Sequence, residues 1–170
     1  MLLCLTSPLE LSPADSALYY KRATAYLSLS RHDNALSDYD QIINLTSDSF
    51  DKAHFMKATI YVKEGRWSDA REALKRYQAK VKADRAAMDL LLDVSDGEMA
   101  AKKVAQAHRA KLWTACEEAA TQALKTASHS VSLREQRAYC AVAAGDYEQA
   151  VGDLTFVCMF LWFFIRGLLI

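Results

Sequence analysis

The 170-residue sequence contains only two prolines and five glycines. With so few breaking residues, it has little room for strands, flexible linkers or disorder, and its alanine-rich hydrophobic fraction of 52% favours helices. It also has no excess of either charge, because 21 basic residues balance 21 acidic ones. Charge therefore gives no reason to expect binding to nucleic acid or to an anionic membrane surface.

The features of an enzyme or a metal protein are missing as well. Glycine is too sparse for a phosphate-binding or dinucleotide-binding loop. Asp38 and Asp40 lie two positions apart on an expected helix, so their side chains face different ways and do not form a pair of acids. We therefore expect no catalytic residues, no cofactor and no metal site.

The four cysteines form no C-x-x-C motif and no cysteine–histidine pair at the spacing of metal ligands, so a zinc site is not expected. They are Cys4, Cys116, Cys140 and Cys158. Buried thiols at helix contacts are the simplest interpretation. Cys116 and Cys140 could approach each other across adjacent helices, but the sequence alone does not give the geometry of a disulfide.

Long hydrophobic runs are also absent. The apolar start at residues 1–5 lacks a basic leader and is too short for a signal peptide. The run 156–165 is unbroken but is followed by Arg166, and it falls below the roughly 18–20 residues of a membrane-spanning helix. Glu148, Gln149 and Asp153 are expected on the outward face of the preceding helix. Beyond Thr155 apolar residues cover every side, so we expect the tail 156–170 to cause aggregation; a membrane anchor is the alternative.

What the sequence does contain is a repeated turn followed by a small residue. The turn occurs at 66–70, again at 145–150 and, more weakly, at 31–35. Ala35 and Ala70 are 35 positions apart, and Cys116 lies 34 positions before Ala150, which indicates units of about 34 residues with one insertion. After an irregular segment 1–15, interpreted as a truncated preceding repeat, four units are predicted, at about 16–49, 51–84, 97–130 and 131–157.

This period predicts an all-α tetratricopeptide-repeat (TPR) solenoid, a right-handed superhelix of antiparallel helix pairs. Helices are expected at 16–29 and 33–45 in the first unit. The extra residues 78–96 are interpreted as a continuation of the second helix of unit two. Their basic residues are expected to form a solvated face, with binding to an acidic partner as the alternative.

Small residues are expected where paired helices cross, and glycines where a first helix ends in the left-handed conformation. These structural positions are Ala23, Ala35, Ala58, Gly65, Ala70, Ala138, Gly145 and Ala150. Unit three departs most from the pattern. Val104 and Cys116 occupy its small positions, and Lys111 stands where the turn glycine would be.

The inner surface formed by the first helices is expected to be apolar and aromatic. Its candidate binding residues are Tyr20, Thr24, Leu27, Phe55, Thr59, Val62, Tyr139 and Val142. By resemblance to the TPR proteins that grip C-terminal carboxylates, lysine and asparagine would be needed at four of these positions, and they are absent. The groove instead suits extended hydrophobic segments of unfolded chains, although some of these residues are expected only to pack against neighbouring helices.

Four segments carry a more specific resemblance: 18–24, 65–70, 95–99 and 133–140. Together with the long junction after unit two, they resemble the N-terminal and middle repeats of the TPR and J-domain co-chaperone family of the endoplasmic reticulum lumen (DnaJ subfamily C), also described as kinase inhibitors. The resemblance covers about Ser16 to Thr155. The family's first repeat and leader have no counterpart ahead of Ser16, and we interpret the sequence as a fragment or a misassembled gene.

This resemblance implies a luminal protein that holds unfolded clients and delivers them to a BiP-type chaperone, with a protein kinase as a further partner. Delivery needs a J domain with a His-Pro-Asp loop, and this sequence contains no His-Pro-Asp. The cytoplasm is the alternative compartment. A second hypothesis is a TPR scaffold or adaptor that the tail anchors to a membrane.

Two further expectations depend on the resemblance. Where the family can carry a cysteine that pairs with the one matching Cys140, this sequence has Ala127, so the family's disulfide is not expected. Residues 44–46 form an acceptor sequence for N-glycosylation, and in a luminal protein Asn44 could carry a glycan.

Overall fold

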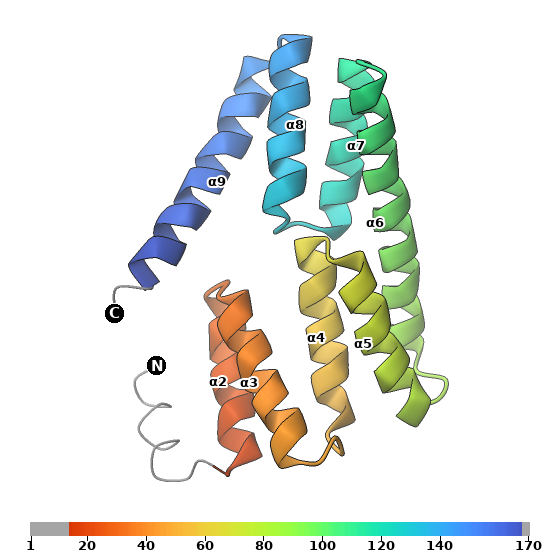
Figure 1. Cartoon of the computed structure of the whole chain (residues 1–170), viewed down its shortest axis with the longest axis vertical. Coiled ribbons are helices and arrows are strands. Elements are labelled where there is room, and N and C mark those ends of the chain that lie inside the picture. Colours follow the sequence, from red (N-terminus) through yellow and green to blue (C-terminus); the bar gives the residue numbers. More distant parts are fainter. Residues whose placement is uncertain (1–13, 168–170) are drawn as a thin grey trace. The chain divides into compact units, whose positions relative to one another are not determined.

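The computed structural model describes residues 14–167, and side chains as far as Met159. The described residues form eight helices and no strand, which confirms the predicted all-α TPR fold (Figure 1). Expectations about residues 1–13, 168–170 and the side chains from Phe160 onward lie outside this range. The helices are α2 (Ser16–Ser28), α3 (His32–Leu45), α4 (Asp51–Glu64), α5 (Trp67–Lys80), α6 (Arg85–Arg109), α7 (Trp113–Thr126), α8 (Val131–Ala144) and α9 (Tyr147–Gly167).

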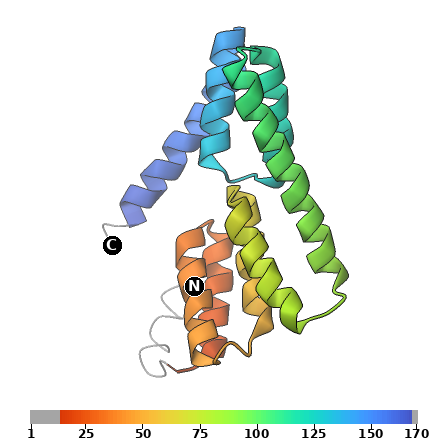
Figure 2. The ribbon, with the colours of Figure 1, turned by 45° about the vertical axis from the view of Figure 1, so that its right-hand side comes forward.

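The chain divides into two compact units. The first contains the residues up to Tyr61 together with 68–91, and the second contains 62–67 and the residues from Leu92 onward. Within the first unit α2 packs against α3, and within the second α8 packs against both α7 and α9 (Figures 1 and 2). Residues 62–67 are the end of α4, the turn after it and the first residue of α5, and they lie in the second unit, where the His129 amide donates to the Lys63 carbonyl over 2.9 Å.

The first unit is built on the apolar face of α3. Ala35, Leu36, Tyr39 and Ile42 follow the i, i+1, i+4, i+7 spacing of one helix face, and all four are buried. Ala23 of α2 is completely buried in the same cluster, where its small side chain allows the two helices to cross closely. Ala58 and Ala70 are also fully buried, as are Ala138 and Ala150 to within 2%.

The core of the second unit is rich in alanine and contains a disulfide. Cys116 of α7 and Cys140 of α8 are bonded, with Cα atoms 6.0 Å apart. The sequence left this pairing open, and the structure forms it. Because the bond joins residues 24 positions apart, the lost freedom of the unfolded chain stabilises the fold by on the order of 3 kcal/mol. The buried residues around it are Ala100, Val104, Ala120, Ala123, Leu124, Ala127 and Leu133.

Two of the helix pairs also carry a buried arginine–aspartate pair. In the first, the Arg22 guanidinium donates to both carboxylate oxygens of Asp38, over 2.9 and 2.6 Å. In the second, Arg137 donates to both oxygens of Asp153 over 2.7 Å, and Arg134 adds a third bond of 3.2 Å. The expectation that Asp153 lies on the outward face of α9 is wrong, since the residue is only 1% exposed. The Asp153 side chain can face the interior because the arginines of α8 neutralise its charge there.

The extra residues near 78–96 do not continue the second helix of unit two. Helix α5 ends at Lys80, and Ala83 takes a left-handed conformation with φ of 59°. The Asp84 side chain then accepts hydrogen bonds from the Ala86 amide (3.1 Å) and the Tyr77 hydroxyl (2.7 Å). This cap starts a new helix, so the insertion lengthens the beginning of α6 instead, to 25 residues in all.

The turns inside the repeats need a left-handed residue. Gly65 and Gly145 supply it with φ of 75° and 90°, a conformation that costs glycine little. In the third repeat Lys111 takes the same conformation, with φ of 57°. The departure seen in the sequence at this turn is therefore accommodated without a change in the backbone conformation.

Candidate functional site

The candidate groove residues of the first unit are largely occupied by packing. The Tyr20 ring lies 6.1 Å from that of Tyr39 and 5.7 Å from that of Phe50, measured between centroids. Leu27 packs against the same core cluster, and the Phe55 ring lies 5.3 Å from that of Tyr77. These side chains are half-buried, so each presents only part of its surface to a partner.

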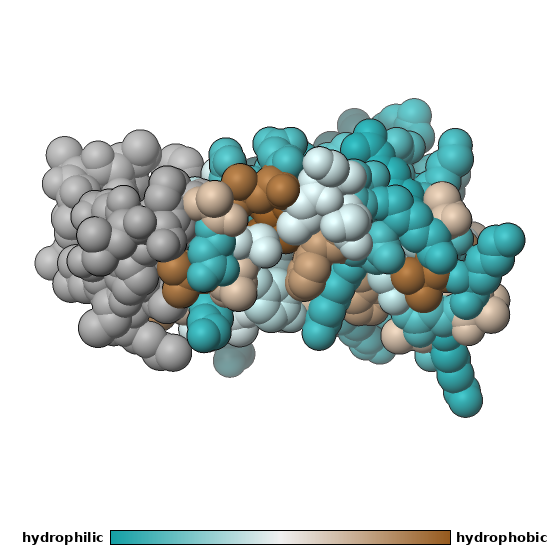
Figure 3. Space-filling view, turned by 90° about the horizontal axis from the view of Figure 1, so that it is seen from below, coloured by the Kyte–Doolittle hydropathy of each residue, from teal (hydrophilic) through white to brown (hydrophobic). Residues whose placement is uncertain are grey.

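The polar members of the predicted groove are bonded to their own helices. The Thr24 hydroxyl donates to the Tyr20 carbonyl over 2.9 Å, and the Thr59 hydroxyl donates to the Phe55 carbonyl over 3.0 Å. Val62, which belongs to the second unit, is 4% exposed and has almost no surface left for binding. On the face drawn in Figure 3, hydrophobic residues form small patches between hydrophilic ones.

The second unit exposes a more prominent hydrophobic surface. Tyr139 and Val142 lie one turn apart on α8, and they are 58% and 48% exposed. The Tyr139 ring lies 5.0 Å from that of His108 and 6.0 Å from that of Trp113, and the last two rings are 5.8 Å apart. Leu112, next to Trp113, is also exposed. We call these five residues the aromatic patch.

Sequence reasoning placed Tyr139 and Val142 in the groove but missed His108, Leu112 and Trp113. A signal for the histidine was present, because His108 lies 34 positions before Val142 and so occupies the same place in the preceding repeat. Trp113 is the first residue of α7. Its role depends on the neighbouring repeat, since its ring meets Tyr139 of α8.

A second polar feature lies at the start of α4. The buried His54 ring donates from Nε2 to Asp48 Oδ1 over 2.5 Å, and Lys80 Nζ lies 2.9 Å from Asp48 Oδ2. The hydrogen bonds from His54 and then Lys80 lower the pKa of Asp48 to about 2. No group of three histidine, cysteine or acidic side chains in the described part of the chain could hold a metal ion. We interpret this cluster as a structural one.

This cluster predicts a pH dependence of stability. Because the pKa of Asp48 is lower in the folded chain than its ordinary value, its contribution is present above about pH 4 and is lost as the pH falls towards 2. We expect Asp48→Asn to reduce the loss of unfolding free energy between pH 4 and 2, measured by urea denaturation. The carboxylate is half exposed, so the effect is modest. Identical pH slopes for the two proteins would contradict this role.

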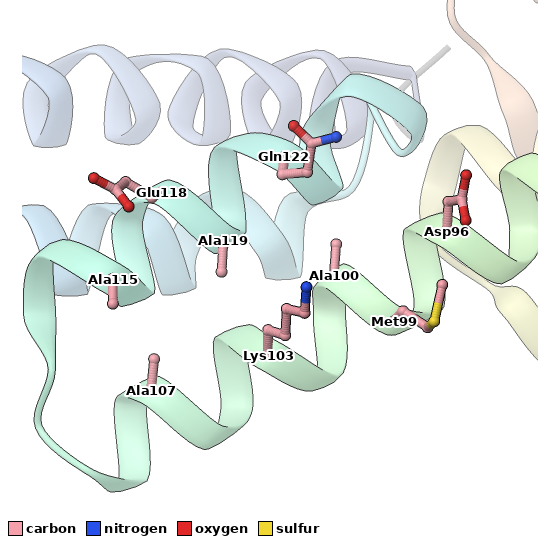
Figure 4. Close-up of a pocket in the computed structure, with 9 residues that line it drawn as sticks. All are labelled: Asp96, Met99, Ala100, Lys103, Ala107, Ala115, Glu118, Ala119 and Gln122. Carbon is pink, nitrogen blue, oxygen red and sulfur yellow. The ribbon is translucent and has the colours of Figure 1, made fainter.

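The gap between α6 and α7 contains a shallow groove of about 540 Å³ (Figure 4). Ala107 and Ala115 point toward each other across it. Lys103 and Glu118 line it with opposite charges, and small side chains make up much of the rest. A small-molecule site needs several polar groups that converge on a ligand, and we assign no ligand to this groove.

Asn44, the possible glycosylation residue, is exposed in the last turn of α3. The Thr46 hydroxyl of the same acceptor sequence donates to the Ile42 carbonyl over 2.7 Å. The side chain that would carry the glycan is therefore accessible in the folded chain.

No family model matches the chain. Among curated proteins, it is 41% identical over 147 residues to the tetratricopeptide repeat and J domain-containing co-chaperone DNJ1 of Cryptococcus neoformans, and 35% identical over 145 residues to DNJ1 of Fusarium oxysporum. It is 25% identical to DnaJ homolog subfamily C member 3 of the rat. These matches cover 86%, 85% and 84% of this chain but only 28%, 27% and 29% of the relatives.

Solved structures show the same fold. The crystal structure of the P58(IPK) TPR domain matches with a TM-score of 0.80 and 23% identity, over 92% of this chain and 44% of that one. MamA from Desulfovibrio magneticus matches with a TM-score of 0.53 and 20% identity, over 93% of this chain and 82% of that one. The chain spans less than a third of the length of the curated relatives that it matches, and it is homologous to the tetratricopeptide-repeat part of the J-domain co-chaperones.

Proposed function

We propose that this chain is a non-catalytic repeat module that holds unfolded or misfolded proteins. The observation that supports this most strongly is the aromatic patch, where Tyr139 and Val142 remain about half exposed beside two further rings. An exposed apolar surface of this kind favours binding of a hydrophobic segment. Homology to co-chaperones supports the same function.

The patch is suited to segments of varied sequence. The Trp113 and Tyr139 rings are large and have few rotatable bonds, so they offer contact area at a low entropic cost. The polar side-chain groups of the patch are the two ring nitrogens of His108, the indole N–H of Trp113 and the Tyr139 hydroxyl, and the rest of its side-chain surface is carbon. The patch therefore recognises segments by their hydrophobicity more than by their sequence. A protein that holds many different unfolded chains needs this kind of recognition.

We place this activity in the endoplasmic reticulum lumen. The Cys116–Cys140 disulfide supports this, since such bonds persist in oxidising compartments and are rare in the cytosol. In this proposal a BiP-type chaperone receives the client through a J domain, and a protein kinase is a further partner. An N-glycan on Asn44 would follow from the same compartment.

A scaffold or adaptor is the second candidate, in which the repeats assemble other proteins and the tail anchors them. No described helix combines the length and hydrophobicity that crossing a membrane requires. The exposed apolar residues of the aromatic patch favour client binding over this alternative, because anchoring does not need them.

The proposed function predicts the behaviour of a double variant, Tyr139→Ser with Val142→Ser. In the full chain it should weaken suppression of the aggregation of a chemically denatured protein, requiring at least about tenfold more chaperone for the same protection. The physical reason is the loss of two exposed apolar side chains from the patch. Light scattering against chaperone concentration measures the effect.

A matched control is available on α9. Tyr147 and Val151 are exposed to 67% and 63%, more than the patch residues, but they lie outside the patch. Tyr147→Ser with Val151→Ser should leave protection unchanged. Equal weakening by both double variants would show that binding follows exposed hydrophobicity in general, and no weakening by either would rule out the patch. Tyr20→Ser with Phe55→Ser tests the groove residues of the first unit in the same assay.

A further inference from the structure

The disulfide and the aromatic patch share the same two helices. Trp113 precedes Cys116 by one turn of α7, and Tyr139 directly precedes Cys140 on α8. Trp113 also packs against the buried cluster that contains both cysteines. The covalent bond between α7 and α8 therefore holds the two backbone segments that bring the Trp113 and Tyr139 rings to 6.0 Å.

Packing alone gives these segments limited support. The buried residues nearest in sequence to the bond on α7 are Ala120 and Ala123, and an alanine buries much less apolar area than a leucine or valine. The third ring, His108, comes from α6 and contacts both of the others, so a shift of α7 against α8 would disturb the Trp113–Tyr139 contact and at least one of the contacts of His108. The larger side chains of this core are Val104, Leu124 and Leu133, and the cross-link adds a covalent constraint to their packing.

We propose that the aromatic patch assembles only when the Cys116–Cys140 bond has formed, so that clients bind the oxidised chain. The consequence for clients rests on the function proposed above. Formation of the bond removes two electrons and two protons from the two thiols. A disulfide of a small molecule or of another protein takes them up by thiol–disulfide exchange and leaves as two thiols.

The burial of the bond determines when this control acts. Both cysteines are completely buried in the folded chain, so a reductant has no direct access to the sulfur atoms. The bond is therefore made while the chain folds and then persists. Oxidation of the two cysteines during folding is therefore required for the aromatic patch to assemble. A chain that folds in a reducing compartment does not form the bond and has no assembled patch.

The test compares two forms of the full chain. The reference carries Cys4→Ala and Cys158→Ala, which removes the thiols outside the pair. The second form adds Cys116→Ala and Cys140→Ala. Alanine suits both places, because Ala35, Ala70 and Ala150 occupy the position of Cys116 in the other repeats, and Ala25 occupies that of Cys140 in the first. Nuclear Overhauser effects between the Trp113 and Tyr139 rings report assembly of the patch.

The reference should show these ring contacts, and the form without the bond should lose most of them. The contact between the Arg134 guanidinium and the Phe156 ring, 3.8 Å apart, serves as the control that α8 and α9 are still folded. If the alanine form does not fold, Cys116→Val with Cys140→Ala refills the volume of the two sulfur atoms. Ring contacts that persist at full strength in a folded form without the bond would overturn the proposal.

Binding of a reduced and alkylated unfolded protein separates the two proposals. If the patch is assembled about a tenth of the time without the bond, the apparent dissociation constant rises about tenfold. If the form without the bond loses the ring contacts and binds the unfolded protein about tenfold more weakly, the result supports both the proposed client site and its control by the disulfide. If the ring contacts are lost while neither form binds, or both bind equally, the disulfide still controls the patch and the proposed client site is wrong.

Discussion

Replacing Asp153 by alanine is expected to lower the free energy of unfolding by about 3 kcal/mol, the largest effect of any single substitution considered for this chain. Asp153 is almost completely buried and accepts hydrogen bonds from Arg134, Arg137 and Gln149. Its removal leaves two guanidinium groups without their counter-ion in a site where they are only 19% and 12% exposed. This partial access to water keeps the loss at the lower end of the range for a broken buried ion pair.

Urea denaturation followed by circular dichroism measures this loss. Asp40→Ala is the control, because the Asp40 carboxylate is 53% exposed in its pair with Lys57 and should contribute less than about 1 kcal/mol. Asp38→Ala should fall between the two, since Asp38 is buried but has one arginine partner, Arg22. Equal denaturation midpoints for the Asp153 and Asp40 variants would contradict the buried pair.

Gly97→Ala should destabilise the chain by about 1–2 kcal/mol, although alanine is the better helix former. Gly97 lies inside α6, and a Cβ atom there would come within 2.4 Å of a carbon of the Trp67 ring. The rigid indole packs against the core of the second unit and has to move to make room. The cost of overpacking then exceeds the gain in helix propensity.

Gly152→Ala, made in the same wild-type chain as Gly97→Ala, is expected to change the free energy of unfolding in the opposite direction. Gly152 lies inside α9, where a Cβ atom would meet nothing within 4 Å. This substitution should therefore stabilise the chain by about 0.5–1 kcal/mol. Thermal or urea unfolding of the two variants gives the comparison, and stabilisation by both would show that the indole yields easily.

The sequence carried most of the information about the fold. Small residues at Ala35, Ala70 and Ala150 recur because paired helices must cross closely in every unit, so the period was visible without a structure. The helices expected at 16–29 and 33–45 agree with α2 and α3 to within one residue at each end. Periodicity predicts such elements well because it reflects contacts that every repeat makes.

Features that occur once were harder to predict. Asp84 starts α6 through a cap that depends on a left-handed alanine, a conformation that alanine rarely takes and that periodicity does not reveal. Asp153 was placed on the outward face because its polarity was considered without its partners, 16 and 19 residues earlier. The Arg22–Asp38 pair has the same 16-residue spacing, and comparing the repeats would have indicated it.

The candidate site was predicted in part for the same reason. Tyr139 and Val142 were found from their repeat positions, and whether they bind clients stays a prediction. The remainder of the aromatic patch joins three helices, so its composition depends on which rings meet across repeats. Val62 is likewise buried by tertiary packing, and its position in the repeat does not predict this burial.

The arginine–aspartate pairs have one more consequence, for the alignment of the helices along their axes. A contact between helices that bury alanines, such as α8 with Ala138 and α9 with Ala150, offers similar packing after one helix slides past the other by a turn, about 5.4 Å. Such a slide would separate Arg137 from Asp153 and leave charge buried without a partner, which only the correct alignment avoids. The first and fourth repeats each hold one such lock, whereas Ala73 and Ala119 occupy the aspartate position in the second and third. The two inner helix pairs must then find their alignment by shape, because the Cys116–Cys140 bond joins α7 to α8 and does not hold α6 against α7.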